Sequence, residues 1–249
     1  SKVLATHSLC TPSSVSSAES TLHSIGRFMS LPPSPAVGSL VAVAESAPAR
    51  FWDQMFTGDV YRYGKEPNAF VAEQLPAHAL QGGRVLCVGD GEGRNGVWCA
   101  SQGFDTVAME PSSAGVARIR LLAAEKGVTL TVLQDLMPSS QVTPGSFDAV
   151  LLSFIHVPPS ARPAFHAACV AALKPGGVIV LEAFTPAQIH NSRKSGGPAA
   201  VDMMFTADLL AADFAALELV LLAEQTVVLS EGPGHSGDAD VVRLVSRKR

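Results

Sequence analysis

The stretch Arg84-Val-Leu-Cys-Val-Gly-Asp-Gly-Glu-Gly-Arg-Asn-Gly96 decides how this chain folds. It begins with an apolar run typical of a buried strand, continues into alternating glycines and ends where a helical pattern starts. Glycine is required where a backbone turns tightly and must approach a ligand with no side chain between them. The stretch therefore predicts a nucleoside cofactor at the carboxyl edge of a parallel sheet; a glycine turn without a ligand is the alternative.

Strand-like and helical patterns alternate after Phe51, which is typical of a parallel sheet with helices on both faces. The strands expected in that sheet are 84–89, 106–110, 129–133, 147–153 and 178–183. Later runs at 217–222, 226–229 and 240–246 predict an antiparallel hairpin. The expected fold is therefore α/β, a Rossmann-like doubly wound sheet that is mostly parallel, with an antiparallel hairpin edge at the C-terminus.

Polar residues at the starts of the helical patterns predict helix caps. Asn68, Ser112 or Ser113, and Ser160 are the expected caps, and a further helix is expected over 94–101. His166 lies on the Ala-rich helix after Ser160 and is expected to face water.

The first 50 residues differ from the rest because they are rich in serine and poor in acidic and aromatic residues. This profile predicts a transit peptide to a mitochondrion or plastid; a tail without an address, on a cytoplasmic protein, is the alternative. The expected division is 1–50 as this Ser/Pro-rich tail and 51–249 as one α/β domain.

The composition excludes several classes of protein. With 249 residues, of which 47% are hydrophobic and 16% charged, the chain can build a sizeable core. The net charge of -4 argues against a general nucleic-acid binder, and no apolar run approaches the ~18 residues of a membrane span. Cys10, Cys87, Cys99 and Cys169 lack metal-site spacing, so we expect buried thiols and no metal.

Two acidic residues strengthen the prediction of a nucleoside site. Glu110 ends the second strand, where a carboxylate can accept hydrogen bonds from ribose hydroxyls. Asp135 follows the third strand, where an acceptor suits the exocyclic amine of adenine. Because Gly91-x-Gly93-x-x-Gly96 also matches the dinucleotide fingerprint, a nucleotide-dependent oxidoreductase is an alternative.

With Leu173-Lys-Pro-Gly-Gly177 ahead of the fifth strand, the chain resembles the class I S-adenosylmethionine-dependent methyltransferases. The resemblance covers 51–249 and is nearest to small methyltransferases related to the tellurite-resistance group. The segments that carry it are Trp52-Asp53, Tyr63-Gly64, Pro67-Asn68, Gly91-Glu-Gly-Arg-Asn95, Phe154-Ile-His156-Val-Pro158, Gly196-Gly-Pro198 and Glu231-Gly-x-x-His235-x-Gly237.

The resemblance implies a set of cofactor-binding residues. These are Gly89, Asp90, Gly91, Gly93, Arg94, Asn95, Glu110, Asp135, Leu136 and Ser153, with S-adenosylmethionine as the cofactor. The glycine loop would hold the methionine part. Many members carry an acid at the position of Cys87, so we expect Asp90 to replace that acid in part.

The residues expected to do chemistry are His156 and His235. His156 follows the fourth strand and could orient or deprotonate an acceptor; the alternative is a backbone hydrogen bond that shapes the loop. The resemblance makes His235 a pocket residue, whereas a hairpin tip by itself favours a solvated histidine.

Three further groups have two interpretations each. His190, Arg193 and Lys194 would attract an anionic acceptor or belong to a solvated loop, and 195–198 would be a lid hinge or a turn. The aromatic residues that would cover the cofactor, or form a hydrophobic cap, are Trp52, Phe56, Tyr61 and Tyr63.

The expected function is methyl transfer from S-adenosylmethionine to a small-molecule or inorganic-anion acceptor of the thiol, selenite or tellurite type. The sequence after the fourth strand lacks the motifs of nucleic-acid base methylation, and neither a nucleic-acid nor a membrane partner is expected. The alternative is a catalytically silent scaffold or assembly subunit with a protein partner.

Overall fold

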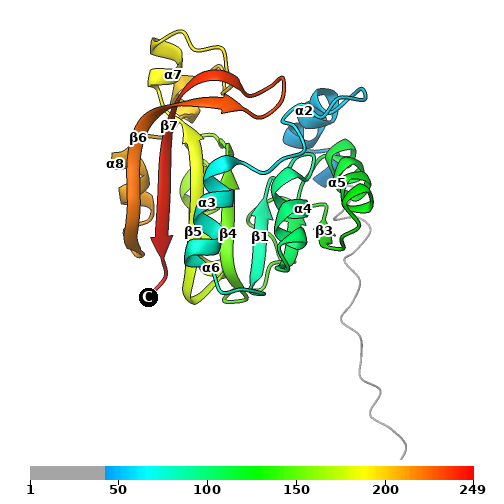
Figure 1. Ribbon diagram of the computed structural model, residues 1–249. Coiled ribbons are helices and arrows are strands. Elements are labelled where there is room, and N and C mark those ends of the chain that lie inside the picture. Colours follow the sequence, from blue (N-terminus) through cyan, green and yellow to red (C-terminus); the bar gives the residue numbers. More distant parts are fainter. Residues whose placement is uncertain (1–42) are drawn as a thin grey trace, which may run out of the picture. The chain divides into compact units, whose positions relative to one another are not determined.

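The structure is a computed structural model that describes residues 43–249 (Figure 1). Most of the predicted tail or transit peptide, and Cys10 with it, lies outside the described residues. The first long helix is α2 (Ala47–Met55), which begins inside that predicted tail. The hydroxyl of Ser46 accepts a hydrogen bond from the Ala49 amide (3.3 Å), and Pro48 lies in the first turn, where its missing N–H costs nothing.

One sheet organises the described chain, and its strands follow the order β3-β2-β1-β4-β5-β7-β6. Strands β1 to β5 run parallel, whereas β7 is antiparallel to both β5 and β6 (Figure 1). This confirms the predicted Rossmann-like sheet with an antiparallel C-terminal edge. The strands are β1 (Arg84–Val88), β2 (Asp105–Met109), β3 (Thr131–Leu133), β4 (Phe147–Ser153), β5 (Leu173–Phe184), β6 (Glu218–Ser230) and β7 (Ser236–Arg247).

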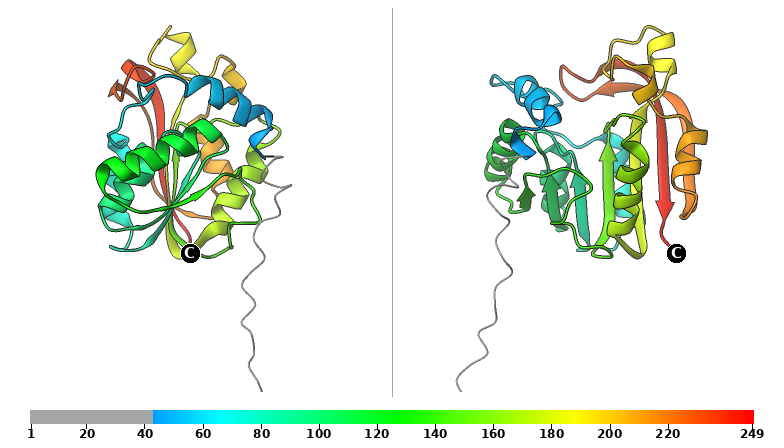
Figure 2. Two further views of the ribbon diagram at one scale, coloured as in Figure 1. Left: turned by 90° about the vertical axis from the view of Figure 1, so that its right-hand side faces the viewer. Right: turned by 180° about the vertical axis from the view of Figure 1, so that it is seen from behind.

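Helices cover both faces of the sheet (Figure 2). Alternate residues of β1 point to opposite faces: Leu86 packs in the core beneath α6 and α8, and Cys87 packs beneath α3 and α4. The remaining helices are α3 (Ala69–His78), α4 (Arg94–Ser101), α5 (Ser113–Lys126), α6 (Arg162–Ala172), α7 (Ala187–His190), the 3-10 turn η1 (Val201–Met203) and α8 (Ala207–Asp213). Cys87, Cys99 and Cys169 are buried free thiols, as predicted.

The two strands predicted at 217–222 and 226–229 form one continuous strand, β6. Its middle residues stay in register with β7, where Glu224 faces Val242 and Gln225 faces Val241. Polar side chains are tolerated there because β6 is an edge strand whose residues are largely exposed. Strand β5 likewise starts at Leu173, five residues before the predicted start, because Leu173 already pairs with Phe147 of β4.

Two predictions about helix α6 are wrong. Its cap position is Ala161 rather than Ser160, and no side chain caps the helix there. His166 is buried instead of facing water, because helix α8 covers it and Asp213 lies 2.7 Å from its Nδ1. Asp213 of helix α8 thus provides the hydrogen-bond partner that allows His166 to be buried on the inner face of α6.

The core position Leu86 should matter far more to stability than an exposed leucine. Leu86 is fully buried, whereas Leu121 is 63% exposed on α5. We predict that Leu86→Ala lowers the free energy of unfolding by about 2–5 kcal/mol, because it removes buried methylenes and leaves a cavity. Leu121→Ala should change it by less than about 0.5 kcal/mol. Chemical denaturation followed by circular dichroism measures both, and equal losses would contradict this packing.

Candidate functional site

The glycine turn after β1 lies at the edge of the sheet where the parallel strands end. Gly91 and Gly93 adopt left-handed conformations, with φ of 61° and 97°. A Cβ at Gly93 would lie 2.9 Å from the Cα of Ile119, and one at Gly91 would press on the Phe56 ring. The turn therefore combines a backbone shape that glycine favours with a packing that leaves no room for side chains.

The carboxylate of Glu110 lies directly against this turn. It accepts hydrogen bonds from the amides of Gly91 (2.8 Å) and Ser112 (2.9 Å), and the residue is 3% exposed. Burial raises the pKa of Glu110 to about 8, although the two backbone hydrogen bonds oppose this shift. The predicted ribose acceptor is therefore beside the glycine turn and is held in one orientation.

Asp90 points into the first turn of α4 instead of along the strand edge. Its carboxylate accepts from the amide of Gly96 at 3.1 and 3.2 Å, and a Cβ at Gly96 would overlap it. Burial raises the pKa of Asp90 to about 7. Cys87, where related enzymes carry an acid, is buried in the core. Asp90 therefore fixes the glycine turn to the first turn of helix α4.

Arg94 and Asn95 connect the glycine turn to distant segments. Arg94 donates to Glu231 (2.6 Å), and the Asn95 side chain accepts from the amide of Asn68 (2.9 Å). Both residues are 6% exposed. Their polar groups form hydrogen bonds with other residues of this chain. Their contribution to a cofactor site is therefore to hold the glycine turn in place.

The residues predicted around the adenine and at the end of β4 share this edge. Asp135 accepts from Gln141 (2.8 Å) through Oδ2 and from the amide of Leu136 (2.8 Å) through Oδ1. Its carboxylate thus orders the loop after β3. The hydroxyl of Ser153 is buried and has no hydrogen-bond partner among the described residues. Ser153 thus lies at the predicted edge, and the described part of the protein leaves the hydrogen bonds of its hydroxyl unsatisfied.

Both ring nitrogens of His156 bind the backbone. Nδ1 lies 2.9 Å from the carbonyl oxygen of Met203, and Nε2 accepts from the amide of Phe184 at 3.2 Å. Burial lowers the pKa of His156 to about 4, which makes the ring neutral. This geometry matches the alternative interpretation, in which His156 shapes the loop, because neither nitrogen is available to deprotonate an acceptor.

His235 is enclosed by an aromatic box formed by Tyr63, Phe154 and Phe184. Their ring centroids lie 4.4, 4.3 and 5.5 Å from that of His235, and Nδ1 is 3.4 Å from Glu231 Oε2. The residue is 4% exposed, and burial lowers its pKa. No residue within 43–249 hydrogen-bonds its Nε2. His235 is thus a neutral, oriented histidine with one nitrogen free.

The backbone at Phe154 supports the same site. Phe154 follows β4 with φ of 55°, a left-handed conformation that costs a bulky residue about 1–3 kcal/mol. Its amide donates to the Glu182 carbonyl (2.7 Å), and this conformation aims its ring at His235. Sequence alone offers no signal for such strain.

Two buried carboxylates lie beside His235 and Asn68: Glu182, which the sequence analysis did not name, and Glu231, which it quoted only as part of a segment that carries the resemblance. Glu182 of β5 is fully buried and receives hydrogen bonds from Arg243 (2.6 Å) and Asn68 (2.5 Å). Asn68 also donates to Glu231 (3.0 Å). The sequence does contain a signal for the Glu182–Arg243 pair. Each of these residues is the single charged residue in an otherwise apolar run, 178–184 for Glu182 and 241–245 for Arg243.

The segment that follows helix α7 packs against strand β7 and His235. Arg193 pairs with Asp238 and Asp240, both at 3.1 Å, so it is not free to attract an anion, while His190 and Lys194 are exposed. Ser195 is buried and donates to the Asp238 carbonyl (2.6 Å). A Cβ at Gly196 would lie 2.8 Å from the His235 ring. The segment 195–198 is therefore a packed turn beside His235.

The aromatic residues of the N-terminal part form a cap over the glycine turn. Trp52 stacks on Phe56 (5.3 Å between centroids), and Asp53 accepts from the Ser112 hydroxyl (2.6 Å). Tyr61 donates to the Arg118 carbonyl (3.3 Å) on α5. Figure 1 shows α2 at the same end of the sheet as the turn of the β6–β7 hairpin. Helix α2 thus covers the predicted cofactor site from one side.

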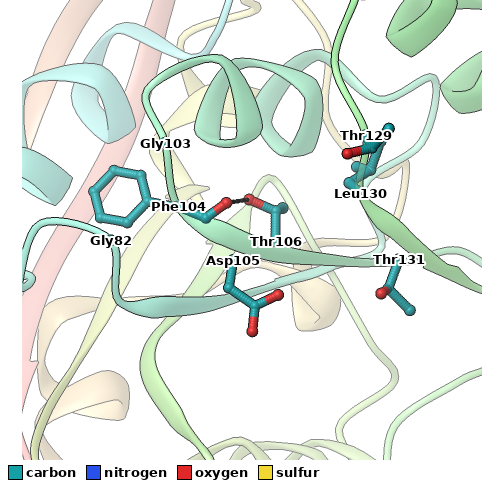
Figure 3. Close-up of a pocket in the computed structure, with 8 residues that line it drawn as sticks. All are labelled: Gly82, Gly103, Phe104, Asp105, Thr106, Thr129, Leu130 and Thr131. Atoms are coloured by element: carbon teal, nitrogen blue, oxygen red, sulfur yellow. Dashed lines mark hydrogen bonds between the residues drawn. The ribbon is translucent and has the colours of Figure 1, made fainter.

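A separate cavity lies at the opposite edge of the sheet (Figure 3). It is formed by the amino ends of β2 and β3, including Thr106 and Thr131. None of the predicted site residues lines it. Among the described residues no cluster of His, Cys, Asp and Glu could hold a metal ion, and no helix is long and apolar enough to cross a membrane.

Comparisons with known proteins agree with this fold. Residues 85–177 match the model of a family described as a methyltransferase domain. No curated protein sequence matches the chain significantly. TehB from Haemophilus influenzae is similar in structure (TM-score 0.59, 14% identity), covering 74% of this chain and 63% of the TehB chain. The match to a SAM-dependent methyltransferase from Methanosarcina mazei has a TM-score of 0.60 at 15% identity and covers 71% of this chain and 97% of the other. The match to the [4+2]-cyclase SpnF has a TM-score of 0.60 at 17% identity and covers 80% of this chain and 94% of the other.

The glycine turn and the Glu110 carboxylate meet at the edge of the Rossmann-like sheet where the sequence predicts a nucleoside site. The fold is that of the class I methyltransferases, and residues 85–177 match a methyltransferase domain, whose cofactor is S-adenosylmethionine.

The raised pKa of Glu110 predicts a pH-dependent affinity for the ribose. A ribose diol donates to the ionised carboxylate, and with a pKa of about 8 that form is a minority at neutral pH. Affinity should therefore rise nearly tenfold per pH unit up to about pH 8 and then level off. Calorimetry with 5′-methylthioadenosine, which lacks the titrating amino-acid part, measures this. Glu110→Gln should give weaker, pH-independent binding, and a flat profile for the unmodified chain would contradict the assignment.

Proposed function

We propose that this protein transfers a methyl group to a small-molecule or inorganic-anion acceptor of the thiol, selenite or tellurite type. The observation that carries the proposal is His235, whose free Nε2 lies in an aromatic box at the edge that holds the glycine turn. The resemblance of the sequence segments to the tellurite-resistance group supports a tellurite-type acceptor, and TehB shares the fold.

When bound, S-adenosylmethionine supplies a methyl group already activated on a sulfonium. The chain must then mainly position the two reacting atoms, which can contribute roughly 7–11 kcal/mol in favourable cases. Glu110 orients the ribose and the glycine turn admits the ligand without side-chain clashes. For a thiol, Nε2 of His235 accepts the proton as the sulfur attacks; an anion arrives without that proton and needs no base.

The surroundings of His235 support a small acceptor. The rings of Tyr63, Phe154 and Phe184 enclose it, and Gly196 packs directly against its edge. Such an enclosure excludes water and bulky groups from the free nitrogen. A protein or nucleic-acid acceptor would have to displace this packing.

The ribose contact can be tested by removing the carboxylate. Above about pH 8, where Glu110 is ionised, Glu110→Ala should weaken S-adenosylmethionine binding by about 1.5–3 kcal/mol, because two hydroxyls lose a charged acceptor. Calorimetric titration measures the dissociation constant, with NADH as a control ligand. The matched control His190→Ala changes an exposed residue and should leave it unaltered. Unchanged affinity in folded Glu110→Ala would refute the ribose assignment, and binding of NADH alone would refute the cofactor.

The role of His235 can be tested by acceptor-dependent turnover. His235→Asn should slow methylation of 2-mercaptoethanol by about 10²–10⁴-fold, because the thiol loses its base. Methylation of selenite should fall less. Cofactor affinity should be kept, and His156→Asn should lower stability without this acceptor-dependent pattern. A wild-type chain that binds cofactor but methylates no thiol, selenite or tellurite would support the scaffold alternative.

A further inference from the structure

Glu231 lies at a buried junction between the two halves of the site. Its Oε2 receives Arg94 Nη1 (2.6 Å) and lies 3.4 Å from His235 Nδ1, while its Oε1 receives Asn68 Nδ2 (3.0 Å). The side chains of Arg94 and Glu231 are 7% and 9% exposed. One carboxylate thus contacts both the glycine-turn helix and the histidine of the aromatic box.

A second connection runs beside the first. Glu92 of the glycine turn accepts from the amide of Arg62 (2.6 Å), and the carbonyl of Arg62 accepts from the amide of Gly234 (2.8 Å). A Cβ at Gly232 would overlap the backbone of Gly64. The segment 62–64 is therefore clamped between the glycine turn and the hairpin turn 231–235, so neither turn can shift without moving the other.

We propose that Glu231 is a positioning residue that couples the glycine turn to His235. Arg94 is the first residue of α4, directly after Gly93, and it orients the Glu231 carboxylate. Glu231 in turn holds the Nδ1–H tautomer of His235 and so presents Nε2 as the acceptor. Binding of cofactor at the glycine turn is thereby transmitted to the acceptor side. This inference rests on the proposed function, in which His235 acts on the acceptor.

The charges around the junction agree with this role. Burial opposes ionisation of Glu231, but the His235 hydrogen bond and the Arg94 guanidinium lower its pKa to about 2. For His235, burial lowers the pKa, Glu231 raises it, and Arg94 and Arg62 lower it. His156, the other histidine that interacts with it electrostatically, is itself neutral. An ionised Glu231 beside a neutral His235 requires the proton to be on Nδ1, because a carboxylate only accepts.

The test is nuclear magnetic resonance of the full chain with ¹⁵N-labelled histidine rings, whose nitrogen shifts report tautomer and protonation. The wild-type His235 ring should show the Nδ1–H tautomer and should shift when S-adenosylhomocysteine saturates the site. In Glu231→Gln we expect a mixture of tautomers, a lower pKa of His235 and loss of most of the ligand-induced shift. Asp148→Asn breaks a more exposed ion pair, with Lys174 (2.7 Å), away from this junction and should change none of these signals.

Glu231→Gln leaves the buried Arg94 without its charged partner, which can prevent folding. The double variant Arg94→Gln/Glu231→Gln removes both charges and should show the same tautomer mixture. If S-adenosylhomocysteine does not bind the wild-type chain, the proposed function fails. If it binds but leaves the wild-type His235 ring unmoved, or if either folded variant keeps the tautomer and the shift, the coupling is overturned while the methyltransferase assignment stands.

Discussion

The ion pair between Arg94 and Glu231 is the interaction on which the rest of the site depends. It joins residues 137 positions apart, and both side chains are almost fully buried. Burying two charges costs several kcal/mol for each ion, and the cost is offset only where further hydrogen bonds complete their surroundings. Asn68 and His235 supply those contacts for Glu231. The pair therefore constrains the glycine turn, the N-terminal segment and the C-terminal hairpin together.

The parallel sheet explains why residues from distant parts of the sequence meet here. Strands β1, β2 and β4 all end at one edge, so Gly91, Glu110 and Ser153 gather there although they lie on separate βα units. Strand β6 then brings the chain back to the same edge, where the turn before the antiparallel strand β7 carries His235. The residues predicted to bind the cofactor thus come from the parallel strands, and the histidine proposed to act on the acceptor comes from the antiparallel hairpin.

Local patterns predicted the glycine turn, the bounds of α4 and the position of Glu110, because strand, turn and cap preferences depend on near neighbours. Local patterns could not predict contacts that depend on tertiary packing between distant segments. The backbone partners of His156 lie 28 and 47 residues away, and Asp213, which lies 47 residues from His166, makes that burial possible. The Glu231–His235 spacing was visible in the sequence, but only the fold shows Arg94 between the glycine turn and this pair.

The start of α2 limits how far the chain can be shortened from its N-terminal side. Ser46 caps the helix whose Trp52 and Phe56 cover the glycine turn. A peptidase that cuts upstream of Ser46 would leave this cover intact. A cut near residue 50, where the composition changes, would remove Ser46 and the first turn of helix α2. The glycine turn would then be exposed to solvent. Any shortening of the chain that keeps this cover must therefore stop before the helix cap, several residues before the sequence composition changes.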